Sequence, residues 1–208
     1  MSDSSLAKST VFVVDDDQAM RNSLKWLIES VGVAVESFAS ADEFLAQYQS
    51  SRAGCLVLDV RMPGMSGLEL LEHLALRNVH IPAVIITGHG DVPMAVRAMK
   101  GGAIDFIEKP FNDEALLDAI RRAIAYEEQQ RSFHSEHVQI QERLSHLTPR
   151  EHEVMAMVTA GKSNKEIANA LGVSAKTIEA HRARVMEKMQ AGSLAELVRM
   201  ALAVNAGD

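Results

Sequence analysis

The side chains best suited to chemistry come directly after segments predicted to be β-strands. They are three carboxylates, a hydroxyl and an ammonium: Asp15, Asp16, Asp59, Thr87 and Lys109. Crowded carboxylates repel one another unless a cation lies among them, and hard oxygen ligands of this kind suit Mg²⁺. A carboxylate nucleophile, Mg²⁺, a hydroxyl donor and an ammonium together indicate phosphoryl transfer. Each group alone would more often be a solvated polar residue at a strand end, but their joint occurrence favours the functional interpretation.

The elements that would position these groups alternate between strand and helix. Strands are predicted at residues 11–14, 33–38, 55–58, 81–86 and 105–108. Each is followed by apolar residues at helical spacing, and five strand–helix repeats predict an α/β doubly wound, five-stranded parallel sheet with right-handed crossovers. The carboxyl ends of such strands meet at one edge, where ligands bind. The single cysteine, Cys55, is predicted to be a small buried apolar side chain.

Helix starts are marked by capping boxes, in which a serine or threonine precedes a glutamate by three residues. Five such pairs occur: Ser40 with Glu43, Ser66 with Glu69, Thr148 with Glu151, Ser163 with Glu166, and Ser193 with Glu196. The last three contribute to a prediction of four short helices in the carboxyl-terminal third. Gly172, between the second and third of these, permits the tight turn of a helix-turn-helix.

The third of these helices, from Ser174 to about Met189, is predicted to read the major groove of DNA. Ile178, Val185 and Met189 would face inward, and Arg182 would lie towards the inner edge. The predicted phosphate binders are Lys162, Lys165, Lys176, Thr177 and Arg184, around a base-reading centre of Glu179, Ala180 and Ala183. A solvated basic face is an equally good interpretation of one such helix alone.

Composition limits the remaining possibilities. The net charge of −7 is unevenly distributed, because residues 146–208 alone are not acidic, with eight basic and seven acidic side chains. No apolar run is long enough to span a bilayer, and the polar start of the chain lacks the apolar core of a signal peptide, so we expect a cytoplasmic protein.

A helical linker is predicted at residues 126–145. An apolar seam within it and just after it recurs at steps of four, three, four and three: Phe133, His137, Ile140, Leu144 and Leu147. This seam could pair with a partner helix, or it could pack on its own chain, and the sequence leaves both open.

Residues 10–125 resemble response-regulator receiver domains in four motifs, at residues 13–17, 58–67, 86–88 and 109–111. The resemblance implies that Asp59 is the phosphoacceptor and that Thr87 and Lys109 bind the phosphoryl oxygens. It also implies that Mg²⁺ is held by Asp15, Asp16, Asp59 and the backbone carbonyl of Arg61. Phe106 matches the aromatic switch position and, lacking a hydroxyl, can report only by packing.

Residues 147–203 resemble LuxR/NarL-type DNA-binding domains in the motifs at 147–151, 164–168 and 173–181, and the whole chain resembles the FixJ-like branch. The expected organisation is a disordered tail at 1–9, a receiver at 10–125, a linker at 126–145 and a small all-α, four-helix helix-turn-helix domain at 146–208. Many family members carry lysine at the positions of Glu179 and Ala183, so their base contacts do not transfer.

The resemblance implies a transcription factor that is phosphorylated on Asp59 by a sensor histidine kinase. Phosphorylation would favour a homodimer that binds double-stranded DNA and activates transcription by RNA polymerase at σ70-type promoters. The last helix, with apolar Leu194, Leu197 and Leu202, would be a dimer contact or ordinary core. One rival is a Mg²⁺-dependent phosphohydrolase, against which Arg61 argues, because such enzymes commonly place a general-acid aspartate there. The other is a DNA-binding protein whose receiver mediates contacts without phosphorylation.

Overall fold

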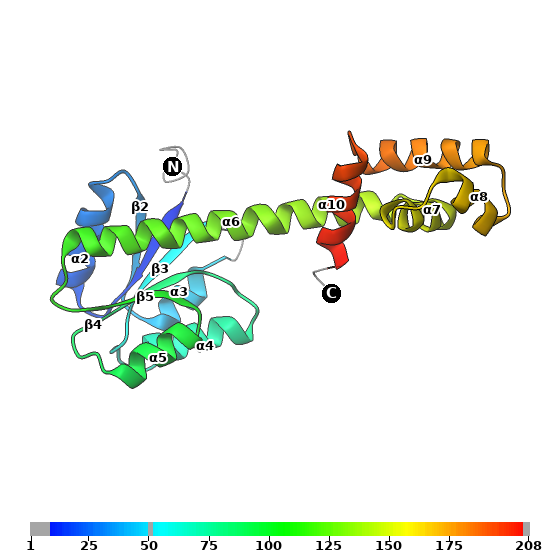
Figure 1. The fold of residues 1–208 in the computed structure, drawn as a ribbon. Helices are drawn as coiled ribbons and strands as arrows, with labels where there is room; N and C mark the ends of the chain where they lie inside the picture. The colour runs from blue at the N-terminus through cyan, green and yellow to red at the C-terminus, as the bar shows by residue number, and fades with distance from the viewer. Residues whose placement is uncertain (1–8, 50–51, 206–208) are drawn as a thin grey trace. The chain divides into compact units, whose positions relative to one another are not determined.

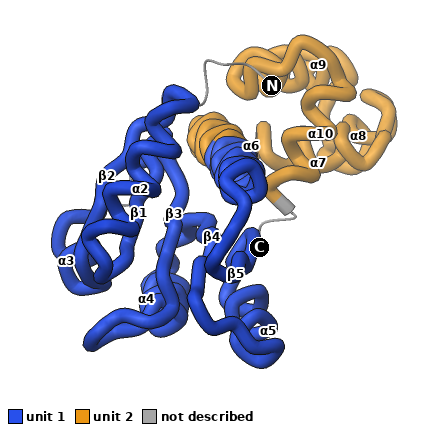
Figure 2. Tube along the Cα trace, turned by 90° about the vertical axis from the view of Figure 1, so that its left-hand side faces the viewer, with its two compact units in different colours: residues 1–131 blue, residues 132–208 orange. Residues whose placement is uncertain are grey.

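The computed structural model describes residues 9–49 and 52–205. The chain divides into two compact units, residues 1–131 and 132–208 (Figure 2). The predicted tail at 1–9 lies outside the described residues apart from Ser9, which is buried. Within the described ranges, no helix combines the length and the apolar character that a bilayer-spanning segment needs.

The first unit contains a five-stranded parallel sheet (Figure 1), and its strands lie in the order β2-β1-β3-β4-β5 (Figure 2). This confirms the predicted fold. The strands are β1 (Thr10–Val14), β2 (Ala34–Phe38), β3 (Gly54–Asp59), β4 (Ala83–Thr87) and β5 (Ala103–Glu108). The helices are α2 (Gln18–Glu29), α3 (Ala41–Gln47), α4 (Gly67–Leu76), α5 (Val92–Lys100) and α6 (Asp113–Ser145). Strand β4 therefore begins two residues later than predicted, and β5 begins two residues earlier.

Two apolar clusters cover the two faces of this sheet. Helices α3, α4 and α5 contribute to one cluster, whereas α2 and the first part of α6 contribute to the other. Strand β3 lies between β1 and β4 and is buried along its whole length, so it forms the centre of the sheet. Cys55 on β3 is fully buried, as predicted, and burial raises the pKa of its thiol to about 12.

The second unit contains four short helices and the carboxyl-terminal part of α6. The helices are α7 (Pro149–Thr159), α8 (Asn164–Leu171), α9 (Ala175–Met189) and α10 (Leu194–Asn205), which confirms the predicted four-helix domain. Gly172 ends α8 with a φ of 68°, the left-handed conformation that the tight turn requires. The core includes Ile167, Ile178, Val185 and Met189.

The predicted linker helix is part of α6, which runs without a break from Asp113 to Ser145. The two halves of its apolar seam lie in different environments. Ile140 is buried in the core of the second unit and Leu144 packs against that core, whereas Phe133 is 58% exposed. The interpretation that the seam packs on its own chain therefore holds for its carboxyl-terminal half.

Three of the five capping boxes are complete, those at Ser66, Thr148 and Ser163. The predicted capping-box contact, from the backbone amide of the N-cap residue to the glutamate, is wrong for Glu43 and Glu196. Both carboxylates reach one residue beyond the cap, where Glu43 accepts from the Ala39 amide at 2.6 Å and Glu196 accepts from the Gly192 amide at 2.9 Å. The caps themselves are formed, since the Ser40 and Ser193 hydroxyls still accept from the third residue of each helix.

The Glu151 carboxylate links α7 to α9 inside the second unit. Its side chain is 3% exposed, and it accepts from Lys188 Nζ at 2.6 Å and from the Thr148 amide at 2.8 Å. The hydrogen bond from Lys188 is the main reason that the pKa of Glu151 is held at about 2, below its ordinary value of 4.5. Stability that depends on a lowered pKa is present above pH 4.5 and is lost as the pH falls from 4.5 towards 2.

Replacing Glu151 with glutamine is therefore expected to lower the free energy of unfolding of this unit by about 2 kcal/mol at pH 7. The difference from the wild type should shrink at pH 3. Hydrogen exchange of α7 and α9 amides in urea measures it in the intact chain. The matched control is Glu153→Gln on the same helix, where an exposed pair with Arg150 is broken and about 0.5 kcal/mol is expected. Equal effects of both substitutions at pH 7 would contradict the prediction.

Candidate functional site

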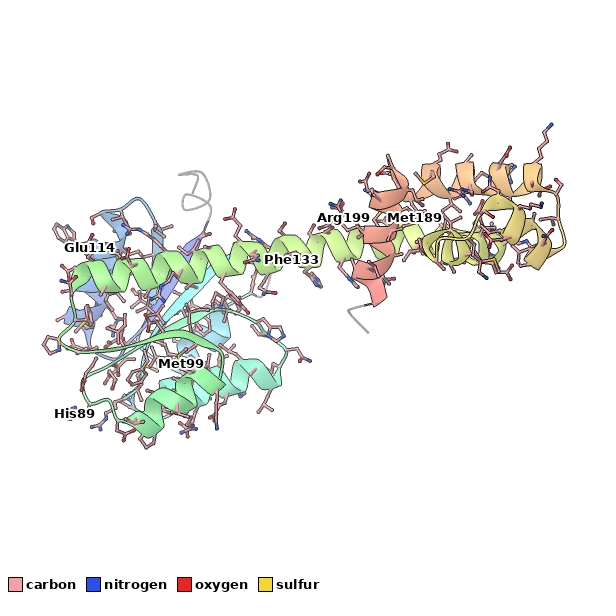
Figure 3. All side chains as sticks on the ribbon, in the orientation of Figure 1. His89, Met99, Glu114, Phe133, Met189 and Arg199 are labelled. Carbon is pink, nitrogen blue, oxygen red and sulfur yellow. The ribbon has the colours of Figure 1, made fainter. Side chains whose placement is uncertain are left out.

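The carboxyl ends of four neighbouring strands bring the predicted chemical groups of the first unit together. Asp59 ends β3, Thr87 ends β4, and Asp15 and Lys109 directly follow β1 and β5. Figure 3 shows His89, just after β4, and Glu114, at the start of α6, at this same end of the sheet. The parallel sheet therefore brings side chains from the ends of separate strands into one cluster.

The Lys109 ammonium lies between the carboxylates of two aspartates. Its Nζ donates to Asp59 Oδ1 at 2.7 Å and to Asp15 Oδ2 at 2.9 Å. The side chains of Asp15 and Asp59 are 1% and 8% exposed. Two buried acids thus share one cation, which offsets their mutual repulsion.

Burial and this ion pair act in opposite directions on the protonation of the cluster. Burial raises the pKa of Asp59 above its ordinary value, and the hydrogen bonds from Lys109 and from the Arg61 amide only partly offset it. Burial also works against the ammonium, but the hydrogen bonds to Asp59 and Asp15 outweigh it and raise the pKa of Lys109. Lys109 is therefore firmly cationic at neutral pH.

The carboxylate oxygens in this cluster are suitable ligands for a hard divalent cation. Oxygens of Asp15 and Asp59 both lie within 3 Å of one atom, Lys109 Nζ, so two carboxylates converge on a small volume. Mg²⁺ commonly takes one or two carboxylates and completes its shell with water and substrate oxygens. Asp16 is exposed, and among the described residues no group of three histidine, cysteine or acidic side chains converges. The structure thus brings together two of the three predicted carboxylates.

The loop between Asp59 and α4 places Arg61 with its backbone towards the site. The Arg61 amide donates to Asp59 Oδ2 at 2.8 Å, and its side chain is exposed. The amide hydrogen bond orients the carboxylate. The predicted role of Arg61, however, concerns its carbonyl.

The Thr87 hydroxyl is fully buried but is bonded within its own loop. Its Oγ1 accepts from the His89 amide at 3.3 Å and donates to the His89 carbonyl at 3.4 Å. Thr87 and Lys109 are joined through the backbone, since the Lys109 amide donates to the Thr87 carbonyl at 2.7 Å. Both hydrogen bonds of the Thr87 hydroxyl are therefore made to the His89 backbone.

Phe106, the predicted aromatic switch, lies so close to Gly90 that its ring would collide with a side chain at that position. A Cβ at Gly90 would lie 2.9 Å from Phe106 Cε1 and 3.5 Å from Thr87 Cγ2. The ring is partly buried against the core. Sequence reasoning did not identify Gly90, because a glycine in a loop shows no sign of the ring that it accommodates.

The predicted DNA-contact residues of the second unit all lie at its surface. Lys162, Lys165, Lys176, Thr177, Glu179, Ala180, Ala183 and Arg184 are each exposed. Figure 1 shows α9 beside α7 and α8, with which it makes most of its contacts. The inward positions Ile178, Val185 and Met189 are buried, as predicted. Arg182 is partly buried and donates to Asn164 Oδ1 at 2.7 Å, so it anchors α9 to α8 as its predicted inner position requires.

The apolar stripe of α10 is divided between core and surface. Leu197 is buried, whereas Leu194 and Leu202 are 45% and 63% exposed. A mostly apolar groove of about 370 Å³ lies between α10 and the part of α6 in the same unit. Phe133 and Arg199, both labelled in Figure 3, are among the residues that line it.

A doubly wound receiver with a carboxylate–lysine cluster, joined to a helix-turn-helix with an exposed recognition helix, defines a two-component response regulator with a DNA-binding output domain. The comparisons with known proteins agree. Residues 11–121 match the family model described as response regulator receiver domain, and residues 145–201 match bacterial regulatory proteins, luxR family.

Similar proteins match over almost the whole chain. The transcriptional regulatory protein FixJ of Rhizobium meliloti is 50% identical over 93% of this chain and 95% of its own length. Nodulation protein W of Bradyrhizobium diazoefficiens is 48% identical over 93% of this chain and 85% of its own length. Among solved structures, response regulator StyR has a TM-score of 0.85 at 47% identity, covering 94% of this chain and 98% of that one. Full-length FixJ from B. japonicum has a TM-score of 0.58 at 46% identity, covering 96% and 98%.

The chain belongs to the LuxR family of response regulators, in its FixJ-like branch. These proteins are transcription regulators and not enzymes, which excludes the phosphohydrolase alternative. The two domains imply a kinase partner and DNA binding, and receiver domains generally bind Mg²⁺ at the phosphorylation site.

Proposed function

We propose that this regulator is switched by transfer of a phosphoryl group from a sensor histidine kinase to Asp59, and that phosphorylation promotes dimerisation and operator binding. The observation that carries the proposal is the position of Lys109 Nζ, within 3 Å of the buried carboxylates of Asp59 and Asp15. A nucleophile, a second acid and a fixed cation then surround the place where phosphoryl charge would develop.

The chemical step is a displacement at phosphorus. An Asp59 oxygen attacks, a P–O bond forms, and the P–N bond of the kinase phosphohistidine breaks with its electron pair remaining on the imidazole. Asp15, Asp16, Asp59 and the Arg61 carbonyl would hold Mg²⁺, which supplies charge neutralisation at the phosphoryl oxygens. Lys109 exchanges one carboxylate contact for a phosphoryl oxygen, and Thr87 leaves His89 to bind another.

The response is a shift between two populations of the receiver. Movement of Thr87 would change the space beside Phe106, because the ring and the threonine methyl both lie close to Gly90. Phe106 belongs to β5, and α5 packs beside β5. Three exposed apolar residues, Val92, Val96 and Met99, follow one another on α5 at steps of four and three. This stripe is the proposed dimer surface of the activated receiver.

The dimer would present two α9 helices to paired half-sites on double-stranded DNA. In each, Glu179, Ala180 and Ala183 face the base edges. Phosphate oxygens are bound by the surrounding set: Lys162, Lys165, Lys176, Thr177 and Arg184. Leu194 and Leu202 on α10 would add a second contact between copies. The bound dimer activates transcription with RNA polymerase in the cytoplasm, where the DNA of a bacterial regulator lies.

The test is molar mass by light scattering in Mg²⁺, with and without beryllofluoride as the phosphoryl mimic. The wild type should change from 22.7 kDa to about twice that mass. Val96→Glu should remain monomeric under both conditions, because it places a charge in the proposed stripe. Leu76→Glu is the matched control, since Leu76 on α4 is 85% exposed and lies outside the stripe. A wild type that stays monomeric would contradict phosphorylation-driven dimerisation and favour a receiver that acts without phosphorylation.

A further inference from the structure

The guanidinium of Arg21 is buried next to the acidic end of β1. Arg21 lies on α2 and is 8% exposed. Its Nη1 donates to the backbone carbonyl of Asp15 at 2.7 Å, and its Nη2 donates to the side-chain oxygen of Gln18. Within the described part of the chain it forms no ion pair, so a buried cation is held by two neutral oxygens. Burying a charge without an opposite charge beside it costs free energy, which the two hydrogen bonds offset only in part.

Every polar atom of Asp15 is fixed by a separate partner. Its amide donates to the Phe38 carbonyl at 3.3 Å, its Oδ1 accepts from the Asp17 amide at 2.9 Å, and its Oδ2 accepts from Lys109. Arg21 holds the remaining atom, the carbonyl oxygen. The acidic residue is thus held on all sides, and one of those contacts comes from a side chain on α2.

The carbonyl that Arg21 holds belongs to the peptide group joining Asp15 to Asp16. This group is planar, so fixing its oxygen fixes the orientation of the Asp16 amide and the direction in which the chain continues. One hydrogen bond from Arg21 therefore constrains both acidic residues. Groups that orient metal ligands in this way commonly change metal affinity by 10- to 100-fold when they are removed.

We propose that Arg21 is a positioning residue that preorganises Asp15 and Asp16 for a divalent cation. The inference rests on the proposed function, in which these acids hold Mg²⁺. Arg21 acts through the geometry of the Asp15–Asp16 peptide group, and its fork of two donors is what a lysine cannot reproduce.

The test is isothermal titration of Mg²⁺ into the full chain, with Arg21→Met, Arg21→Lys and Gln18→Ala. Both Arg21 substitutions should weaken Mg²⁺ binding by about tenfold. Gln18→Ala should weaken it by less, because it removes only the second acceptor of the guanidinium. Since Gln18 is exposed, this variant keeps the test valid even if an Arg21 variant does not fold. Lys25→Met, a loss of the same charge from an exposed position on the same helix, should leave binding unchanged.

Three other outcomes would overturn the inference, each for a different reason. Unchanged Mg²⁺ affinity with a lower unfolding temperature in the Arg21 variants would overturn the inference and leave Arg21 a structural residue. Tighter binding by Arg21→Met with no change in Arg21→Lys would also overturn it, because the effect would then be one of charge. Failure of the wild type to bind Mg²⁺ would overturn the proposed metal role itself, and this inference with it.

Discussion

Replacing Asp59 with asparagine is expected to slow acyl phosphate formation by more than about 1,000-fold, because the amide is not a nucleophile. The fold should survive. Burial raises the pKa of Asp59, so ionising this carboxyl costs more in the folded chain than in the unfolded chain, and a neutral amide removes that penalty. We therefore expect an unfolding temperature equal to or above that of the wild type.

Intact-mass spectrometry after incubation with acetyl phosphate and Mg²⁺ measures this reaction. The matched control is Asp91→Asn, the same chemical change at the N-cap of α5, where asparagine caps a helix as well as aspartate does. That variant should be phosphorylated at the wild-type rate. Phosphorylation of Asp59→Asn at a comparable rate would show that another side chain is the acceptor.

The second large effect concerns α9. Replacing both Lys176 and Arg184 with alanine should weaken DNA binding by about 100-fold, since each substitution removes a charge-assisted hydrogen bond to a phosphate group. The slope of log affinity against log salt should fall by about two for each DNA-binding domain bound. The loss should be nearly uniform across DNA sequences, because phosphate contacts carry no sequence information.

Fluorescence polarisation with labelled duplexes between 50 and 200 mM salt, on the beryllofluoride-treated protein, measures both quantities. A control with Lys25 and Arg121 replaced by alanine removes two positive charges from exposed ion pairs of the receiver. It should bind as the wild type does. If both double variants lost affinity equally, net charge and not the surface of α9 would explain the binding.

The convergence of Asp15, Asp59 and Lys109 follows from local patterns alone. Each residue directly follows or ends a predicted strand, and a parallel sheet brings such positions to one edge. The buried positions of α9 followed in the same way from helical periodicity, which also placed Arg182 on the inner edge. These features depend on backbone geometry, which short stretches of sequence determine well.

Other features depend on side-chain packing over long separations and had no local signal. Arg21 has the sequence appearance of an ordinary surface arginine on an amphipathic helix, yet it is buried. Glu151 and Lys188 are 37 residues apart, and no pattern in either helix predicts their pairing. The reach of Glu43 to Ala39 depends on a choice of rotamer that the capping motif leaves open.

The hydrogen bonds at the carboxyl edge of the sheet bear on two properties of the proposed switch: its output before phosphorylation and its reversibility. The two groups proposed to hold the phosphoryl oxygens already have partners: Lys109 has two carboxylates, and Thr87 has the His89 backbone. In the proposed mechanism, activation would exchange one set of hydrogen-bond partners for another, and its free energy would be the difference between the two sets. In the proposed mechanism, spontaneous entry into the active arrangement would break these contacts without replacing them, so we expect a low basal output. We expect the response to be reversible for the same reason, because loss of the phosphoryl group would leave both residues free to bind their original partners again.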